Sequence, residues 1–233
     1  MKRSELNEII REGEKFIASF GFKLPEFANW SVDDWQRNKP RAGEVIRARL
    51  GWDITDFGRG DFDNLGLLLF TVRNGSADNL KSGKGMVYAE KIMISRENQV
   101  TPFHTHKVKT EDIIVRGGAP LEVRLYNGEP GHPIDAKAPV KVRMDGIDRE
   151  VPAGGVVQIH PGSSITLEPG HVHSFWAAGG DCLVGEVSTV NDDETDNYFL
   201  DMVSRFPDVE EDEPPYRLIV PDYAKLCSSR RPA

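Results

Sequence analysis

The 233-residue chain carries 29 Lys and Arg residues against 37 Asp and Glu residues, which gives a formal net charge of −8 at pH 7. This acidic balance disfavours binding to nucleic acid and to anionic lipid. The hydrophobic fraction is 39%, and no apolar run approaches the roughly 18 to 20 residues that cross a bilayer, so we expect no membrane partner.

The N-terminal stretch MKRSELNEIIREGEKF has charges throughout, where a secretory signal needs an uninterrupted apolar core. We therefore expect a cytoplasmic protein. The only two cysteines, Cys182 and Cys227, have no CxxC or Cys/His pattern around them, so no disulfide framework is expected.

Two helices are predicted at the start of the chain. Apolar residues recur at helical spacing over residues 4–20, which is typical of an amphipathic helix. A second helix is predicted to begin after Ser31, which forms a capping-box pattern with Asp34, and to run to about residue 49 with a break near Pro40.

Beyond about residue 66 the sequence changes to short β-rich runs bounded by Gly, Asn, Pro or Asp. The runs are GLLLFTVRNG, MVYAEKIMISREN, EDIIVRGG, PLEVRLYNGE, VKVRMDGIDREV, GGVVQIHPG, SITLEPG and DCLVGEVSTV. Their close spacing is typical of antiparallel strands in a sandwich or barrel, and Asp145-Gly146 predicts a two-residue hairpin turn. The later stretch LIVPDYAKL is compatible with a last strand or with a short closing helix.

Two histidine pairs indicate a metal site. His104 and His106 are separated by one residue, so on a strand their side chains share one face, and Glu111 follows them closely. His171 and His173 form a second pair just after a Pro-Gly turn. Four of the six histidines thus lie in two short clusters, which predicts that they bind a metal ion.

The chain resembles the cupin superfamily at these positions. The first cupin motif runs Gly, five residues, His-x-His, three or four residues, Glu, six residues, Gly. Here His104, His106, Glu111 and Gly117 follow it with the last gap one residue shorter, and Asn98 replaces the first Gly. Asn tolerates the left-handed backbone conformation that such a Gly supplies.

The second cupin motif ends with Gly, two residues, His, three residues, Asn. Gly162, Gly170 and His173 keep the motif spacing, and Ala177 replaces the Asn. The resemblance therefore implies that His173 is the fourth ligand, and that His171 lies beside the site or on the surface. It also implies a mainly β fold: a jelly-roll-like antiparallel β-barrel with N-terminal helices.

Three imidazoles and one carboxylate without a thiolate suit a six-coordinate Mn²⁺, Fe²⁺ or Co²⁺ ion with open positions. They are less typical of a closed Zn²⁺ site, although Zn²⁺ remains an alternative.

We expect a single cupin domain over residues 1–233. It divides into a helical or irregular extension (1–65), the barrel (66–206) and a closing segment (207–233). A homodimer is expected, because cupin barrels often bury a sheet edge or face against a second copy, and two-fold dimers are the commonest closed assembly.

A closer resemblance, over nearly the whole chain, is to the D-lyxose isomerase family of cupins. It rests on LGWDITDFG, LLLFTVRNG, YAEKIM, VTPFHTHKVKTEDII, HSFWA, GEVSTVNDDETDNYF and EEDEP. The resemblance implies interconversion of D-lyxose with D-xylulose and of D-mannose with D-fructose, with Mn²⁺ as the preferred ion.

Such an isomerisation needs a group that carries a proton between C1 and C2, through a cis-enediol. Glu186, on a later strand, is the candidate base, unless it only forms a structural ion pair. Lys109 precedes Glu111 by two residues and therefore shares its strand face; the family implicates a lysine at this position. We expect Lys109 to donate a proton or hold the sugar, with a pKa lowered by the nearby cation, unless it is an exterior lysine. A hydride shift remains an alternative to the enediol.

Acidic residues after the last strand are candidate sugar ligands. Asp192, Asp193 and Asp196 could hydrogen-bond the sugar hydroxyls, although NDDETDN is also typical of a capped turn. Of the three, Asp193 is predicted to bind substrate. Glu213 is predicted to bind substrate if the acidic loop that it shares with Glu211 folds over the barrel mouth; otherwise both are solvated.

Two other functions are compatible with the same four ligands. A cupin dioxygenase would use Fe²⁺ and O₂ at an open position. A non-catalytic sugar-binding cupin would use the metal only to order the barrel, and the fold alone does not distinguish these functions.

Overall fold

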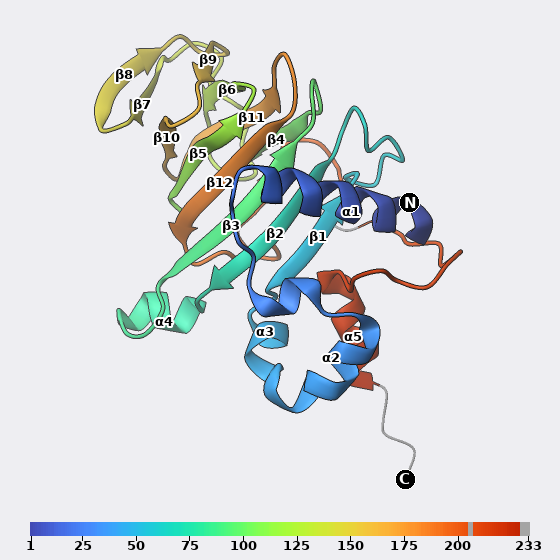
Figure 1. Ribbon diagram of the computed structural model, residues 1–233. Coiled ribbons are helices and arrows are strands. Elements are labelled where there is room, and N and C mark those ends of the chain that lie inside the picture. Colours follow the sequence, from blue (N-terminus) through green and yellow to red (C-terminus); the bar gives the residue numbers. More distant parts are fainter. Residues whose placement is uncertain (205–206, 229–233) are drawn as a thin grey trace.

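The computed structural model describes residues 1–204 and 207–228 (Figure 1), and its strands form two antiparallel sheets. The eight-stranded sheet contains, in spatial order, β1 (Gly51–Thr55), β2 (Leu67–Asn74), β3 (Tyr88–Ser95), β12 (Cys182–Thr189), β5 (Glu111–Gly118), β10 (Ser164–Leu167), β7 (Val140–Met144) and β8 (Ile147–Val151). The five-stranded sheet contains β13 (Tyr198–Phe199), β4 (Thr101–Thr105), β11 (His171–Ala177), β6 (Leu121–Asn127) and β9 (Val156–Ile159).

Apolar side chains from both sheets form the interior core. Leu69 on β2 and Val115 on β5 belong to one buried cluster with Val123 on β6 and Phe175 on β11. Strand side chains alternate between faces, so a strand such as β6 contributes every second residue to this core. The mainly β, antiparallel fold predicted from the sequence is confirmed.

Helix α1 (Arg3–Ser19) covers the outer face of the eight-stranded sheet, where Figure 1 shows it lying across β1 to β3. Leu6 and Ile10 on its buried side belong to one apolar cluster with Leu68 and Phe70 of β2. Because β2 is buried on both faces, its apolar residues run consecutively and do not alternate with polar ones.

The remaining helices are short: α2 (Val32–Asn38), α3 (Gly43–Arg47), α4 (Ala77–Ser82), α5 (Tyr223–Ser228) and the 3₁₀ turns η1 (Glu26–Asn29), η2 (Lys39–Arg41) and η3 (Val220–Asp222). The predicted capping box is present, because the Asp34 amide donates to Ser31 Oγ at 3.1 Å. The predicted break also occurs, since η2, which contains Pro40, separates α2 from α3. The stretch LIVPDYAKL closes the chain with η3 and α5 and forms no strand.

The hairpin predicted at Asp145-Gly146 joins β7 to β8. Both turn residues have positive φ, 50° and 79°, as a type I′ turn requires. One boundary differs from the expected division of the chain: β1, within residues 1–65, is an edge strand of the eight-stranded sheet and pairs with β2.

The segment after residue 207 is fixed to α1 by ion pairs. Arg3 is fully buried; its guanidinium contacts Glu211 at 2.8 Å and Asp222 at 2.8 Å. Hydrogen bonds and the charges of these two carboxylates outweigh the burial of Arg3 and raise its pKa, so the guanidinium stays protonated. Over the described part of the chain, no helix is both long and apolar enough to span a bilayer.

Candidate metal centre

Four side chains from both sheets meet inside the barrel. His104 lies on β4 directly opposite His173 on β11, because these two strands pair in that register. His106 follows β4 by one residue and returns to the same side as His104. Glu111 begins β5 on the other sheet and reaches across to the histidines.

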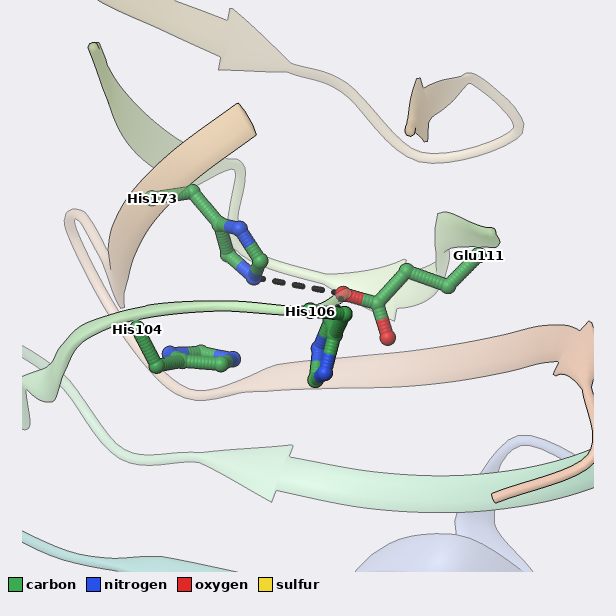
Figure 2. A group of neighbouring side chains, drawn as sticks. All are labelled: His104, His106, Glu111 and His173. Carbon is green, nitrogen blue, oxygen red and sulfur yellow. Dashed lines mark ion pairs between the residues drawn. The ribbon is translucent and has the colours of Figure 1, made fainter. Parts of the chain in front are cut away.

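The ligand atoms of the four residues converge on one point. One nitrogen from each histidine and one oxygen of Glu111 all lie within 4.8 Å of one another, and all four residues are buried. Figure 2 shows the three imidazole rings grouped beside the carboxylate. Glu111 Oε1 lies 3.2 Å from His173 Nε2 and 3.4 Å from His106 Nε2.

Backbone carbonyls set the tautomer of each histidine. The Nδ1 atoms of His104, His106 and His173 lie 2.8, 2.5 and 3.2 Å from the carbonyl oxygens of Pro102, Asp196 and His171. A carbonyl oxygen only accepts, so each Nδ1 carries the hydrogen and donates it. Each Nε2 therefore keeps a lone pair directed at the shared point, as a metal ligand requires.

Burial and neighbouring charges favour the protonation states in which His104 and Glu111 can bind a metal ion. Burial and the neighbouring His173 and His106 hold the pKa of His104 well below its ordinary value, so its imidazole is neutral. Burial alone would raise the pKa of Glu111, but the ammonium of Lys109 and the adjacent histidines lower it well below the ordinary range. Glu111 is therefore a carboxylate.

The donor set fits a divalent cation. His106 Nε2, His173 Nε2 and Glu111 Oε1 are buried and have no hydrogen-bond partner. Buried polar atoms without a partner are costly, and a cation at the point they share would satisfy all three together. Three imidazoles and a carboxylate leave open positions on a six-coordinate ion.

Lys109 lies next to this cluster. Its Nζ is 2.6 Å from Glu111 Oε2 and 3.2 Å from Glu186 Oε1, and the residue is 4% exposed. Burial would lower the pKa of Lys109, but these two carboxylates outweigh it and raise the pKa above its ordinary value. The expectation of a pKa lowered by a cation is thus opposed by the carboxylates, which keep the ammonium protonated.

Glu186 on β12 is held by two lysines and a hydroxyl. Lys91 Nζ lies 3.1 Å and Lys109 Nζ 3.2 Å from Glu186 Oε1, to which Ser188 Oγ also donates at 3.2 Å. Lys91 is opposite Glu186 in the pairing of β3 with β12, and it also donates to Asn191 Oδ1 at 2.7 Å. Glu186 is thus a buried carboxylate held between two ammonium groups beside the histidine cluster.

Sequence reasoning did not identify Lys91. The run YAEKIMIS is buried on both faces of β3, with Met93 in the interior core and Ile92 and Ile94 under α1. Its pattern therefore does not tell which face is the interior. The available signal was the period of two, which places Lys91 on the same face as Met93.

These groups surround a small cavity of about 40 Å³. Its polar lining includes Lys91, Lys109, Glu186 and Asp193, and the aromatic rings of Phe57, Phe175 and Phe199 form part of its apolar wall. Ligand pockets usually measure roughly 300 to 1,000 Å³. The cavity is therefore smaller than a typical ligand pocket.

The acidic residues after β12 have different positions. Asp193 lines the cavity, and its negative charge helps to raise the pKa of Lys109. Asp192 caps its own turn by accepting the amides of Glu194 and Thr195. Asp196 is 8% exposed and accepts backbone amides of the loop after β4.

Two predicted positions lie elsewhere. Glu213 accepts a hydrogen bond from Asn7 of α1 at 2.6 Å, and Glu211 pairs with Arg3, so this acidic loop packs along the first helix and not over the cavity. Glu213 is not among the cavity-lining residues of the described chain. His171 accepts the amide of Glu168 through Nδ1 at 3.0 Å and lies outside the ligand cluster, as expected.

The sequence matches a family model described as D-lyxose isomerase over residues 1–223. The chain is 47% identical to a D-lyxose/D-mannose isomerase of Serratia proteamaculans over 231 residues, which covers 98% of this chain and 100% of that protein. It is 45% identical to a D-lyxose/D-mannose isomerase of Escherichia coli O157:H7 over 229 residues, which covers 97% and 100%.

Solved structures support the fold. An L-ribose isomerase of Acinetobacter sp. DL28 in complex with L-ribose has a TM-score of 0.56 at 16% identity, with 86% of this chain and 93% of that chain covered. An L-ribose isomerase of Cellulomonas parahominis with L-ribose has a TM-score of 0.54 at 17% identity and covers 90% and 98%. At these sequence identities, the structural similarity shows only the fold. The family is shown by the sequence matches over nearly the whole chain, and the protein belongs to the D-lyxose isomerase family.

Proposed function

We propose that this member of the D-lyxose isomerase family, an aldose–ketose isomerase, interconverts D-lyxose with D-xylulose and D-mannose with D-fructose at the cavity beside the histidine cluster. The names of its relatives from Serratia proteamaculans and Escherichia coli O157:H7 support this pair of aldoses. We further propose that His104, His106, Glu111 and His173 hold the divalent ion.

The observation that carries the proposal is the buried contact of Lys109 with both Glu111 and Glu186, at 2.6 and 3.2 Å. Aldose–ketose isomerisation removes a proton at C2 and adds one at C1. It therefore needs one carboxylate free to accept and return a proton, within reach of the groups that bind the two oxygens. Glu111 faces the imidazoles, which leaves Glu186 for this role.

Glu186, Lys109 and Lys91 have separate roles in the proposed reaction. Glu186 takes the C2 proton and returns it to C1 on the same face of a cis-enediol. Lys109, which its carboxylate neighbours keep protonated, gives a proton to O1 as the cis-enediol forms and takes one back from the O2 hydroxyl as the ketose carbonyl forms. Lys91 holds Glu186 in place from the opposite strand. A divalent ion bound by the four ligands would polarise the oxygens at C1 and C2.

Asp193 is proposed as a ligand of the sugar hydroxyls, because it lines the same cavity. Glu213 has no part in the proposed site, since it packs against α1. A free sugar is proposed in place of a sugar phosphate, because the net charge is −8 and the sequence has no Walker-type or GxGxxG phosphate-binding loop.

Mn²⁺ is the proposed ion, with Co²⁺, Fe²⁺ and Zn²⁺ as alternatives, because imidazole and carboxylate donors without thiolate suit a six-coordinate ion. We propose a homodimer, because edge strands such as β8 and β9 offer unpaired backbone groups to a second copy.

The test is ketose formation from a panel of free aldopentoses and aldohexoses with Mn²⁺, using EDTA-treated protein as the control. D-lyxose and D-mannose should give ketose only in the presence of the ion. Oxygen uptake with Fe²⁺ and no sugar turnover would instead favour a dioxygenase. Sugar binding without turnover in Mn²⁺ would favour a non-catalytic cupin.

A further inference from the structure

The loop between β4 and β5 carries two residues of the proposed site, the ligand His106 and the proton donor Lys109. It has no regular secondary structure of its own. Successive amides in such a loop need partners if the loop is buried. The partners come from the last residue of β12 and from the segment that follows it, more than 70 residues later in the chain.

Asp196 supplies most of these partners. Its Oδ1 accepts the amides of Lys107 at 2.8 Å and Val108 at 3.0 Å, and its Oδ2 accepts the amide of Lys109 at 2.8 Å. One buried carboxylate thus binds three consecutive amides. Hydrogen bonds from backbone amides to an ionised carboxylate are about twice as strong as neutral ones, so this contact fixes the loop firmly.

The backbone of the same residue holds the metal ligand. The carbonyl oxygen of Asp196 accepts the Nδ1 hydrogen of His106 at 2.5 Å, which directs the Nε2 lone pair of His106 toward Glu111 and His173. The side chain of Asp196 therefore fixes the position of the loop, and its carbonyl oxygen fixes the orientation of the His106 imidazole.

The segment around Asp196 also forms part of the cavity wall. Asp193, Asn197 and Phe199 line the cavity. Asn197 Oδ1 is buried without a hydrogen-bond partner, and Phe199 pairs with His104 through β13 and β4. A shift of this segment would therefore move the cavity wall and the loop between β4 and β5 together.

We propose that Asp196 is a positioning residue that ties the wall of the sugar cavity to the metal-binding loop, so that His106 and Lys109 are held in place before ion and sugar bind. The ion-binding part of this inference stands on the geometry alone, and the part that concerns Lys109 rests on the proposed function. Asp196 belongs neither to the histidine cluster nor to the residues that line the cavity.

The test compares Asp196→Asn with Asp192→Asn. The first variant keeps the side-chain shape but replaces one acceptor oxygen by an NH₂ group that faces a loop amide. The second changes an aspartate in the same segment whose side chain caps only its own turn. We would measure the Mn²⁺ dissociation constant by calorimetry on metal-free protein, and the visible absorption spectrum with Co²⁺.

Asp196→Asn should raise the Mn²⁺ dissociation constant by about 10- to 100-fold, as losses around metal ligands generally do, and should alter the Co²⁺ spectrum. Asp192→Asn should stay within about twofold of the parent protein. An unchanged dissociation constant in Asp196→Asn, or equal weakening in both variants, would overturn the proposal. Both readouts remain valid if the protein turns over no aldose, so failure of the proposed function is detected separately.

A second measurement needs no variant that might misfold. In the metal-free parent protein, the amides of Lys107, Val108 and Lys109 should be strongly protected from hydrogen exchange, because Asp196 binds them without help from the ion. Exchange as fast as that of an exposed loop would overturn the proposal.

Discussion

Replacement of Glu186 by Gln tests the proposed base and has two separable consequences. Gln keeps the size of the side chain and lies outside the ligand cluster, so the metal should stay bound. Loss of a general base should lower kcat by about 10²- to 10⁴-fold, which corresponds to about 2.7 to 5.4 kcal/mol of activation free energy.

The same change should lower the free energy of unfolding. Glu186 contacts Lys91 and Lys109 at 3.1 and 3.2 Å, and both lysines are buried. Removal of one member of a buried ion pair costs about 3 to 5 kcal/mol. We expect the free energy of unfolding to fall by about 3 kcal/mol, the lower end of this range, because Lys91 keeps Asn191 and Lys109 keeps Glu111 as partners.

A double variant separates charge balance from base catalysis. Lys91→Met combined with Glu186→Gln removes one cation and one anion, so urea unfolding should show stability closer to the parent protein while kcat remains low. Glu90→Gln, which changes a carboxylate on β3 that pairs with Arg73 on β2, serves as the control and should leave kcat unchanged. Normal kcat in Glu186→Gln, or its recovery in the double variant, would refute the base assignment.

Three further predictions concern the ion, the substrate and the C-terminal segment. His173→Ala should remove bound Mn²⁺ and activity, whereas His171→Ala should retain most of both in a metal titration; equal loss would refute the ligand assignment. Free aldoses should have a higher kcat/KM than their phosphates, because the chain has a net charge of −8 and no phosphate-binding loop; the reverse ranking would contradict the proposed substrate class. The hydrogen bond from Arg3 lowers the pKa of Glu211 from 4.5 to about 2, so this ion pair stabilises the fold above about pH 4.5 and is lost as the pH falls toward 2. Glu211→Gln should therefore be less stable than the parent at pH 7, with a difference that shrinks below pH 4.5; a difference independent of pH would show that the charge is not responsible.

Local sequence spacing was sufficient to predict three of the clustered residues. His104 and His106 share a strand face and Glu111 follows within the same segment, so their proximity needs little long-range information. His173 was assigned only through its place in a cupin motif, because its proximity depends on the pairing of β11 with β4. The hairpin at Asp145-Gly146 could likewise be predicted, because the type of a two-residue turn depends on the turn residues themselves.

Long-range register explains what the sequence did not predict. Lys91 reaches Glu186 because β3 pairs with β12 in one particular register, and both faces of β3 are buried. Asp196 looked like a possible sugar ligand, but its partners are loop amides nearly 90 residues earlier. The position of Glu213 depends on the path of the segment along α1, which no local pattern encodes.

The most direct test of the central claim is turnover of D-lyxose in D₂O by the Mn²⁺-loaded protein, with the ketose analysed by NMR. If Glu186 carries the proton through a cis-enediol, part of the product should contain deuterium at C1, because a proton held on a carboxylate exchanges with solvent. The metal-free protein should form no ketose. Ketose formed without any deuterium would contradict the account and indicate a hydride shift.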